Sequence, residues 1–230
     1  MELRTSTSTV REPVRPADAY ADTGVLRRAV PVTAALFVTG GLLMAAGGAL
    51  HPQGSGGTLE AHLLSMFASP GWPLAHALLL VGGVTSFLAM ASAWRSQAFG
   101  ARVQRWLPLA MIGWGFGALE LVPHLLAADE AHGLAHHEAT PVLDLHVFMQ
   151  VIASPAVGLT GALLAVAVAR ASRSRTAWVL AVFAVVGGVA SAAAGPLTVL
   201  ADDPRFSVLF PFQAGLAVWL TGTGVRLLRR

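Results

Sequence analysis

Residues 30–50 read VPVTAALFVTGGLLMAAGGAL, a run of 21 residues without a charged side chain. An α-helix needs about 20 mainly apolar residues to cross the roughly 30 Å hydrocarbon core of a bilayer. This run therefore predicts a transmembrane helix. It follows Arg27 and Arg28 and is longer than the apolar core of a cleavable signal peptide, so we interpret it as an uncleaved signal anchor.

Five further apolar stretches follow along the chain. They cover Trp72–Ala93, Leu107–Ala127, Val142–Ala169, Ala177–Leu200 and Phe206–Val225. The composition agrees with this pattern, because 55% of the 230 residues are hydrophobic and only 12% are charged. Soluble domains carry roughly 25% charged residues. We therefore predict an all-α integral membrane protein, a bundle of six transmembrane helices formed by residues 29–230.

The arginines are distributed unevenly between the segments that flank these stretches. With the N-terminus inside the cell, fourteen of the fifteen lie in inner segments, and only Arg205 lies outside. Cytoplasmic loops carry an excess of basic residues, so both termini are predicted to be cytoplasmic. The predicted location is the plasma membrane, which in a bacterium is the inner membrane. Residues 1–28 are rich in Ser, Thr, Pro and charged residues and predict a disordered cytoplasmic tail.

Two local patterns concern the packing of the helices. Gly187, Ser191 and Gly195 recur every four residues, which predicts a smooth helix face for close helix approach. Prolines inside the predicted spans are expected to kink the fourth, fifth and sixth helices. They are Pro155, Pro196 and Pro211.

The first outer loop contains a short amphipathic segment, Thr58–Ser69. Its apolar residues fall on one side at helical spacing: Leu59, Leu63, Met66 and Phe67. Thr58 is a suitable N-cap, because its hydroxyl can accept a hydrogen bond from a free backbone N–H of the first turn. We predict a helix that lies on the outer membrane surface. The alternative is that this helix covers the histidines as a lid.

All eight histidines fall on the predicted outer side of the membrane. They are His51, His62, His76, His124, His132, His136, His137 and His146. Four of them lie at the outer ends of the first four spans, one on each span: His51, His76, His124 and His146. If these four helices surround a common centre, their imidazoles converge in one layer.

A carboxylate accompanies this layer. Glu120 lies four residues before His124 and therefore on the same helix face, and an ionisable group inside a span marks a functional site. Neutral imidazole suits copper, zinc or iron. We predict an outward-facing transition-metal site with a redox or hydrolytic role, in which Glu120 is a fourth ligand or a catalytic base. The predicted ligands are His51, His76, Glu120, His124 and His146.

The fourth span adds a polar stripe beside the predicted ligands. His146, Gln150 and Ser154 are spaced by four residues and are expected to point into the bundle. Asp144 is roughly 200° round the helix from His146 and is predicted to lie on another face.

Two other functions are compatible with the same residues. Haem b is the first, with His76 and His146 as axial ligands from opposite helices and Arg205 as the one outer arginine for its propionates. The second is a proton- or metal-coupled transporter or a pH-sensing accessory subunit. Partners beyond the lipid bilayer would be another membrane protein or a second copy of the chain.

A second group of histidines lies in the outer segment Ala128–Thr140. His132 and His136 are four residues apart, a spacing that places two imidazoles on one metal ion if the segment is helical. His137 follows directly. A metal-collecting loop and a solvated loop are both open alternatives.

Several chemistries are excluded by missing residues. The chain has no cysteine, which removes disulfides, thiolate metal sites and catalytic thiols. It also has no lysine and hence no Walker A motif, and it contains neither an HExxH helix nor a GxSxG elbow. Its basic residues lie in short clusters between apolar runs rather than on one face, which argues against nucleic-acid binding.

Overall fold

The computed structural model describes residues 16–229, with side chains from Val30 onward. Helix α1, Pro16–Leu50, begins within the segment that the sequence predicts to be a disordered tail. The part of that prediction that concerns residues 1–15 lies outside the described residues.

The described chain is all-helical, as predicted. After α1 come α2 (Leu59–Phe67), α3 (Trp72–Ser96), α4 (Ala101–Gln104), α5 (Leu107–Leu126), the 3-10 helix η1 (Ala127–Glu130), α6 (Ala131–Ala135), α7 (Pro141–Ser172), α8 (Arg175–Leu200), the 3-10 helix η2 (Pro204–Gln213) and α9 (Ala214–Leu228). Six helical stretches are long and apolar enough to cross a membrane. Large apolar side chains are exposed around the bundle, including Leu42, Leu88, Ile112, Phe148 and Val182, as expected of helices that face lipid.

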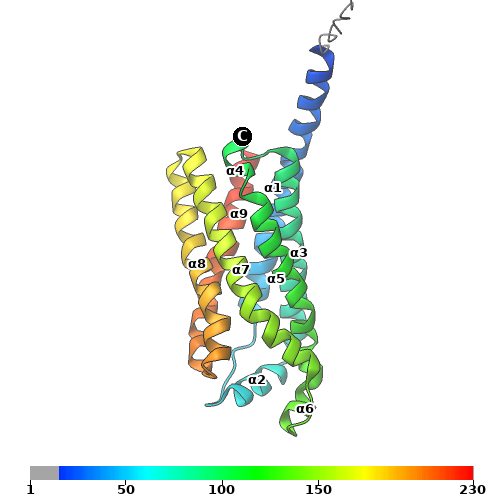
Figure 1. The fold of residues 1–230 in the computed structure, drawn as a ribbon, viewed down its shortest axis with the longest axis vertical. Coiled ribbons are helices and arrows are strands. Elements are labelled where there is room, and N and C mark those ends of the chain that lie inside the picture. Colours follow the sequence, from blue (N-terminus) through cyan, green and yellow to red (C-terminus); the bar gives the residue numbers. More distant parts are fainter. Residues whose placement is uncertain (1–15, 230) are drawn as a thin grey trace, which may run out of the picture.

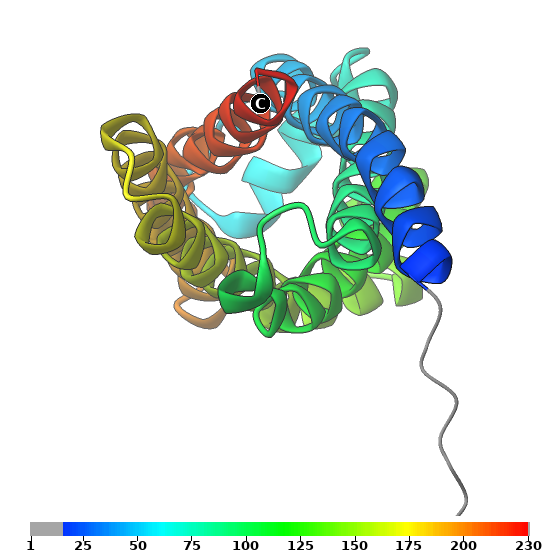
Figure 2. The same cartoon turned by 90° about the horizontal axis from the view of Figure 1, so that it is seen from above.

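The long helices form a closed ring in chain order (Figures 1 and 2). Each packs against the next, and the ring closes because α1 lies between α3 and α9. Helix α2 crosses one end of the ring, and α6 lies at the same end (Figure 1). Away from α2, the centre is filled by Phe37, Trp114 and Trp219, each no more than 2% exposed.

The sixth span differs from its prediction in its first half. A continuous α-helix over Phe206–Val225 was expected, but Pro204–Gln213 forms a 3-10 helix and the α-helix begins only at Ala214. Pro211 explains part of this difference, because proline has no N–H to donate to the carbonyl four residues earlier. The Asp203 side chain accepts a hydrogen bond from the Arg205 N–H and starts the 3-10 turn.

Small residues bring α8 against two neighbours. Gly187, Ser191 and Gly195 are all buried, which confirms the predicted packing face. Gly187 faces Gly215 at the start of α9, whereas Gly195 faces Gln150 and Ser154 on α7. The Ser191 hydroxyl also donates to the Ser154 carbonyl at 3.2 Å.

The closest approach between α7 and α8 gives a stability prediction. A Cβ atom at Gly158 would collide with the backbone carbonyl oxygen of Gly188, and rigid backbone cannot yield cheaply. We expect Gly158→Ala to lower the free energy of unfolding by about 1–3 kcal/mol, the usual cost of overpacking. Thermal unfolding in detergent measures the effect. Gly48→Ala is the matched control, because a Cβ there meets nothing within 4 Å; equal melting of both variants would contradict the prediction.

Helix α2 packs against the end of the bundle. Its N-cap is Thr58, whose hydroxyl accepts from the Ala61 N–H at 3.2 Å, as predicted. Phe67 is buried in a small apolar cluster with Trp72, Ala127 and Leu143, on which Leu63 and Met66 also pack. The apolar face therefore covers protein at the ring end where the four predicted span-end histidines lie, and the predicted contact with the membrane surface stays a prediction.

Candidate metal centre

All five predicted ligands meet at the α2 end of the bundle. They come from four helices or their ends: His51 directly follows α1, His76 lies in α3, Glu120 and His124 lie in α5, and His146 lies in α7. The ligands form two groups, His51–His76–His124 and Glu120–His124–His146, in each of which the donor atoms lie within 4.8 Å of one another. His124 belongs to both. These buried His/Glu clusters could hold a metal ion.

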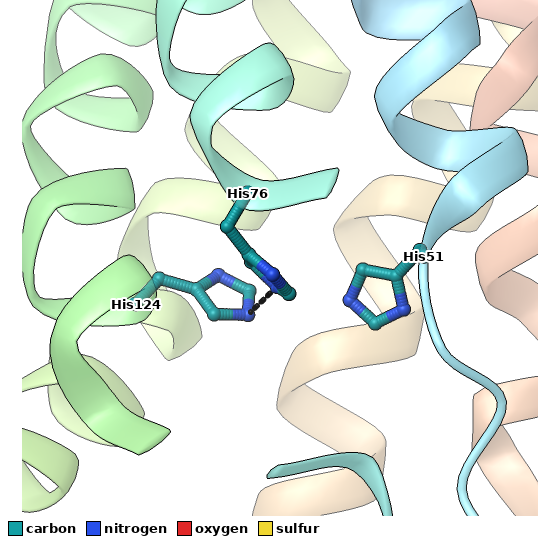
Figure 3. A group of neighbouring side chains, drawn as sticks. All are labelled: His51, His76 and His124. Carbon is teal, nitrogen blue, oxygen red and sulfur yellow. Dashed lines mark hydrogen bonds between the residues drawn. The ribbon is translucent and has the colours of Figure 1, made fainter. Parts of the chain in front are cut away.

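Three imidazoles converge in the first group (Figure 3). The Nε2 atoms of His76 and His124 are 3.1 Å apart. The ring centre of His51 lies 4.8 Å from that of His76. Helix α3 brings His76 between the other two rings, because α1 and α5 pack on either side of it.

Backbone carbonyls fix the orientation of two of these rings. His76 Nδ1 lies 2.8 Å from the Trp72 carbonyl oxygen, and His51 Nδ1 lies 2.9 Å from that of Pro52. A carbonyl can only accept, so each Nδ1 carries the proton and each Nε2 of the neutral ring keeps its lone pair. Metal-binding histidines are held in this way, with the second ring nitrogen bonded to a carbonyl or carboxylate.

Glu120 holds the second group. Its Oε1 accepts a hydrogen bond from His146 Nδ1 at 2.6 Å and lies 3.4 Å from His124 Nδ1. The His146 ring stacks on the His124 ring, with centres 4.0 Å apart. Glu120 and His146 are 7% and 4% exposed, so the carboxylate has its histidine partners in place of bulk water.

The single ring proton of a neutral His124 cannot serve both of its contacts. Since His76 Nδ1 is protonated, the neutral His76 Nε2 can only accept, and the 3.1 Å contact needs a proton on His124 Nε2. A neutral His124 would then direct its Nδ1 lone pair at the Glu120 carboxylate. With the proton on Nδ1 instead, two Nε2 lone pairs face each other. Either a second proton on His124, paired with the Glu120 carboxylate, or a metal ion between the two Nε2 atoms removes this conflict.

Apolar and aromatic groups enclose the centre. Trp72 stacks on His76 with ring centres 3.7 Å apart, and its indole Nε1–H donates to the Leu125 carbonyl at 3.1 Å. His76 itself is fully buried. The sequence pattern did not indicate this role of Trp72, although its position four residues before His76 puts both on one helix face.

Other residues singled out in the sequence lie apart from the centre. His132, His136 and His137 are exposed on or beside α6, and Asp144 is exposed on the far side of α7 from His146. His62 lies on the buried side of α2, a position that the sequence did not indicate.

The geometry bears differently on the alternatives. His124 contacts both His76 and His146, so a porphyrin with these two as axial ligands would have to displace the His124 ring. For a transporter, the aromatic residues that fill the centre of the ring leave the described interior poorly suited to an open path. A mononuclear metal site fits the observed ring positions without displacement.

Comparison with protein-family models, with curated proteins and with solved structures gives no match. Function therefore has to be inferred from the residues of the site.

Proposed function

We propose that this membrane protein binds a transition-metal ion through the Nε2 atoms of His51, His76 and His124. The convergence of three imidazole donor atoms within 4.8 Å of one another is the observation that carries the proposal. The distances support it too: two ligands on a tetrahedral ion with metal–nitrogen bonds of about 2.0–2.1 Å lie about 3.4 Å apart, close to the 3.1 Å between His76 and His124.

Glu120 and His146 support this ligand set from behind. With the ion on His124 Nε2, the ring proton occupies Nδ1 and faces Glu120 Oε1. The carboxylate then orients His124 and places one negative charge beside the cation. The 2.6 Å contact between Glu120 and His146 has the length of a hydrogen bond, which is shorter than the separation of two ligands on one ion. We therefore revise the role of His146 from ligand to partner of Glu120.

Three protein ligands leave a fourth position for water or a substrate, the pattern of catalytic rather than structural sites. A bound ion would supply Lewis acidity, activation of water or a redox couple. Neutral imidazoles suit copper, zinc or iron. Glu120 is then the candidate catalytic base, either through His124 or after a side-chain rotation towards the open position.

Elemental analysis of the detergent-purified protein tests the proposal. About one equivalent of a transition metal per chain is expected in the native protein, and none in a His76→Ala, His146→Ala double variant, because removal of a buried ligand leaves only two. The same metal content in both samples would refute the site. If the metal is iron, an absorption spectrum is needed. A Soret band would identify haem and would rule out the mononuclear site.

Metal retention should extend to lower pH than free imidazole allows. Burial lowers the pKa of His51 below its ordinary value of 6.5, so its neutral, metal-binding form persists as the pH falls towards and below that value. Protons displace the ion only when the pH passes through the lowered pKa. We expect full occupancy after dialysis at pH 6.5 and release at more acidic pH. Half-release above that pH would contradict the prediction.

A further inference from the structure

A second pair of imidazoles lies on the surface near this centre. His132 lies in α6 and His136, four residues later, is the C-cap of that helix; their ring centres are 4.1 Å apart. Both side chains are exposed. The sequence predicts this juxtaposition only on condition that the segment is helical; the structure forms a helix over Ala131–Ala135, and His136 follows as its C-cap.

One ring of this pair is oriented by a backbone carbonyl. His136 Nδ1 donates to the His132 carbonyl oxygen at 2.8 Å, so the neutral ring of His136 keeps its lone pair on Nε2. This is the same arrangement that holds His51 and His76 in the buried centre. Two histidines one helical turn apart are a recognised basis for a transition-metal site, in which water completes the coordination.

Helix α2 connects the surface pair with the buried centre. It packs against α6, and Glu60 on α2 lies 3.9 Å from the His137 ring. His62 lies on the buried side of the same helix, where its ring covers Gly54 in the loop that follows His51.

From these contacts we propose that His132 and His136 form a second, exposed transition-metal site that collects ions for the buried histidines. Its collecting role rests on the metal centre proposed above. With two protein ligands in place of three, this site binds more weakly and exchanges faster. Helix α2, which packs against α6 and carries His62 next to the loop after His51, lies along the way from one site to the other, and its movement would open that way.

Titration of the full-length protein with Cu²⁺ tests the proposal, because paramagnetic resonance resolves differently ligated Cu²⁺ ions. The native protein should show one tight and one weaker class of site, and a His132→Ala, His136→Ala double variant should retain only the tight class. Quenching of tryptophan emission reports how fast the tight class is loaded at low free Cu²⁺. This loading should be roughly tenfold or more slower in the variant, because a nearby site raises the local ion concentration. Both substitutions are on exposed residues, so folding is preserved.

His137→Ala is the matched control, since His137 is exposed in the same segment but its ring lies near Glu60 rather than a second imidazole. It should load as fast as the native protein. A weak class that survives in the double variant, or an unchanged loading rate, would overturn the proposal. A His51→Ala, His76→Ala variant distinguishes failure of the surface site from failure of the buried centre. This variant should lose the tight class and keep the weak one. Absence of the tight class from the native protein would count against the buried centre alone.

Discussion

Replacement of His124 by alanine is expected to reduce the bound metal from about one equivalent per chain to background, because too few ligands remain to hold a buried ion. Among the described residues, His124 is the member that both groups of donors share. Its loss leaves His51 and His76 without their third partner and removes the ring that separates them from Glu120. Metal content after removal of free ions measures this result.

His146→Ala is the informative comparison, since its ring is also buried and stacks on His124. On the proposed ligand set it removes a hydrogen bond to Glu120 and no ligand. The variant should therefore keep its metal, with an affinity about tenfold to a hundredfold lower, the usual effect of losing a supporting partner. Metal lost from His146→Ala but kept in His124→Ala would move the ion to the Glu120–His146 side and reject the trihistidine centre.

The helices were predictable because their lengths follow from the thickness of a bilayer. The predicted ends at Leu50 and Leu200 and the predicted starts at Trp72 and Leu107 coincide with those of the structure. Charged, proline or glycine residues interrupt the apolar runs near these points and leave little choice. The 3-10 segment before Ala214 was not predictable in this way, because hydropathy does not distinguish an α-helix from a tighter one.

Convergence of the ligands could be predicted only on the condition that the first four spans surround a common centre. The rise of 1.5 Å per residue places His76, His124 and His146 at similar depths, but depth does not say which helices are neighbours. The ring order of α1, α3, α5 and α7 supplies that information. The acceptors that orient His51 and His76 are backbone carbonyls, which every residue possesses, so the sequence carries no mark of them.

The negative charge of Glu120 is expected to contribute to metal affinity. A divalent ion on three neutral imidazoles brings two positive charges into an apolar site, and burial of an uncompensated charge is costly. Glu120 supplies the carboxylate in the two groups of donor atoms described above, and its Oε1 lies 3.4 Å from His124 Nδ1. It therefore both orients a ligand and offsets part of the charge of the ion.

Glu120→Gln is accordingly expected to lower metal affinity by about tenfold to a hundredfold, while the protein without metal melts near the native temperature. Glutamine has nearly the same shape and its amide oxygen can still accept the His146 Nδ1–H, but it carries no charge. Glu120→Ala removes the acceptor too and leaves a buried N–H unpaired, at a cost of about 1–3 kcal/mol in the free energy of unfolding. Competition with a metal-chelating dye gives the affinities, and thermal melts of metal-free samples give the stabilities.

The two variants separate charge from packing. A metal affinity of Glu120→Gln equal to that of the native protein would mean that the carboxylate does not act on the ion, and that Glu120 serves only to bond His146. A loss in both variants of the same size, with lowered stability in Glu120→Ala alone, would assign the effect on the ion to the negative charge and the effect on the fold to the hydrogen bond. The effect on the ion and the effect on the fold can be distinguished because Oε1 makes two different contacts, one of 2.6 Å to His146 and one of 3.4 Å to His124.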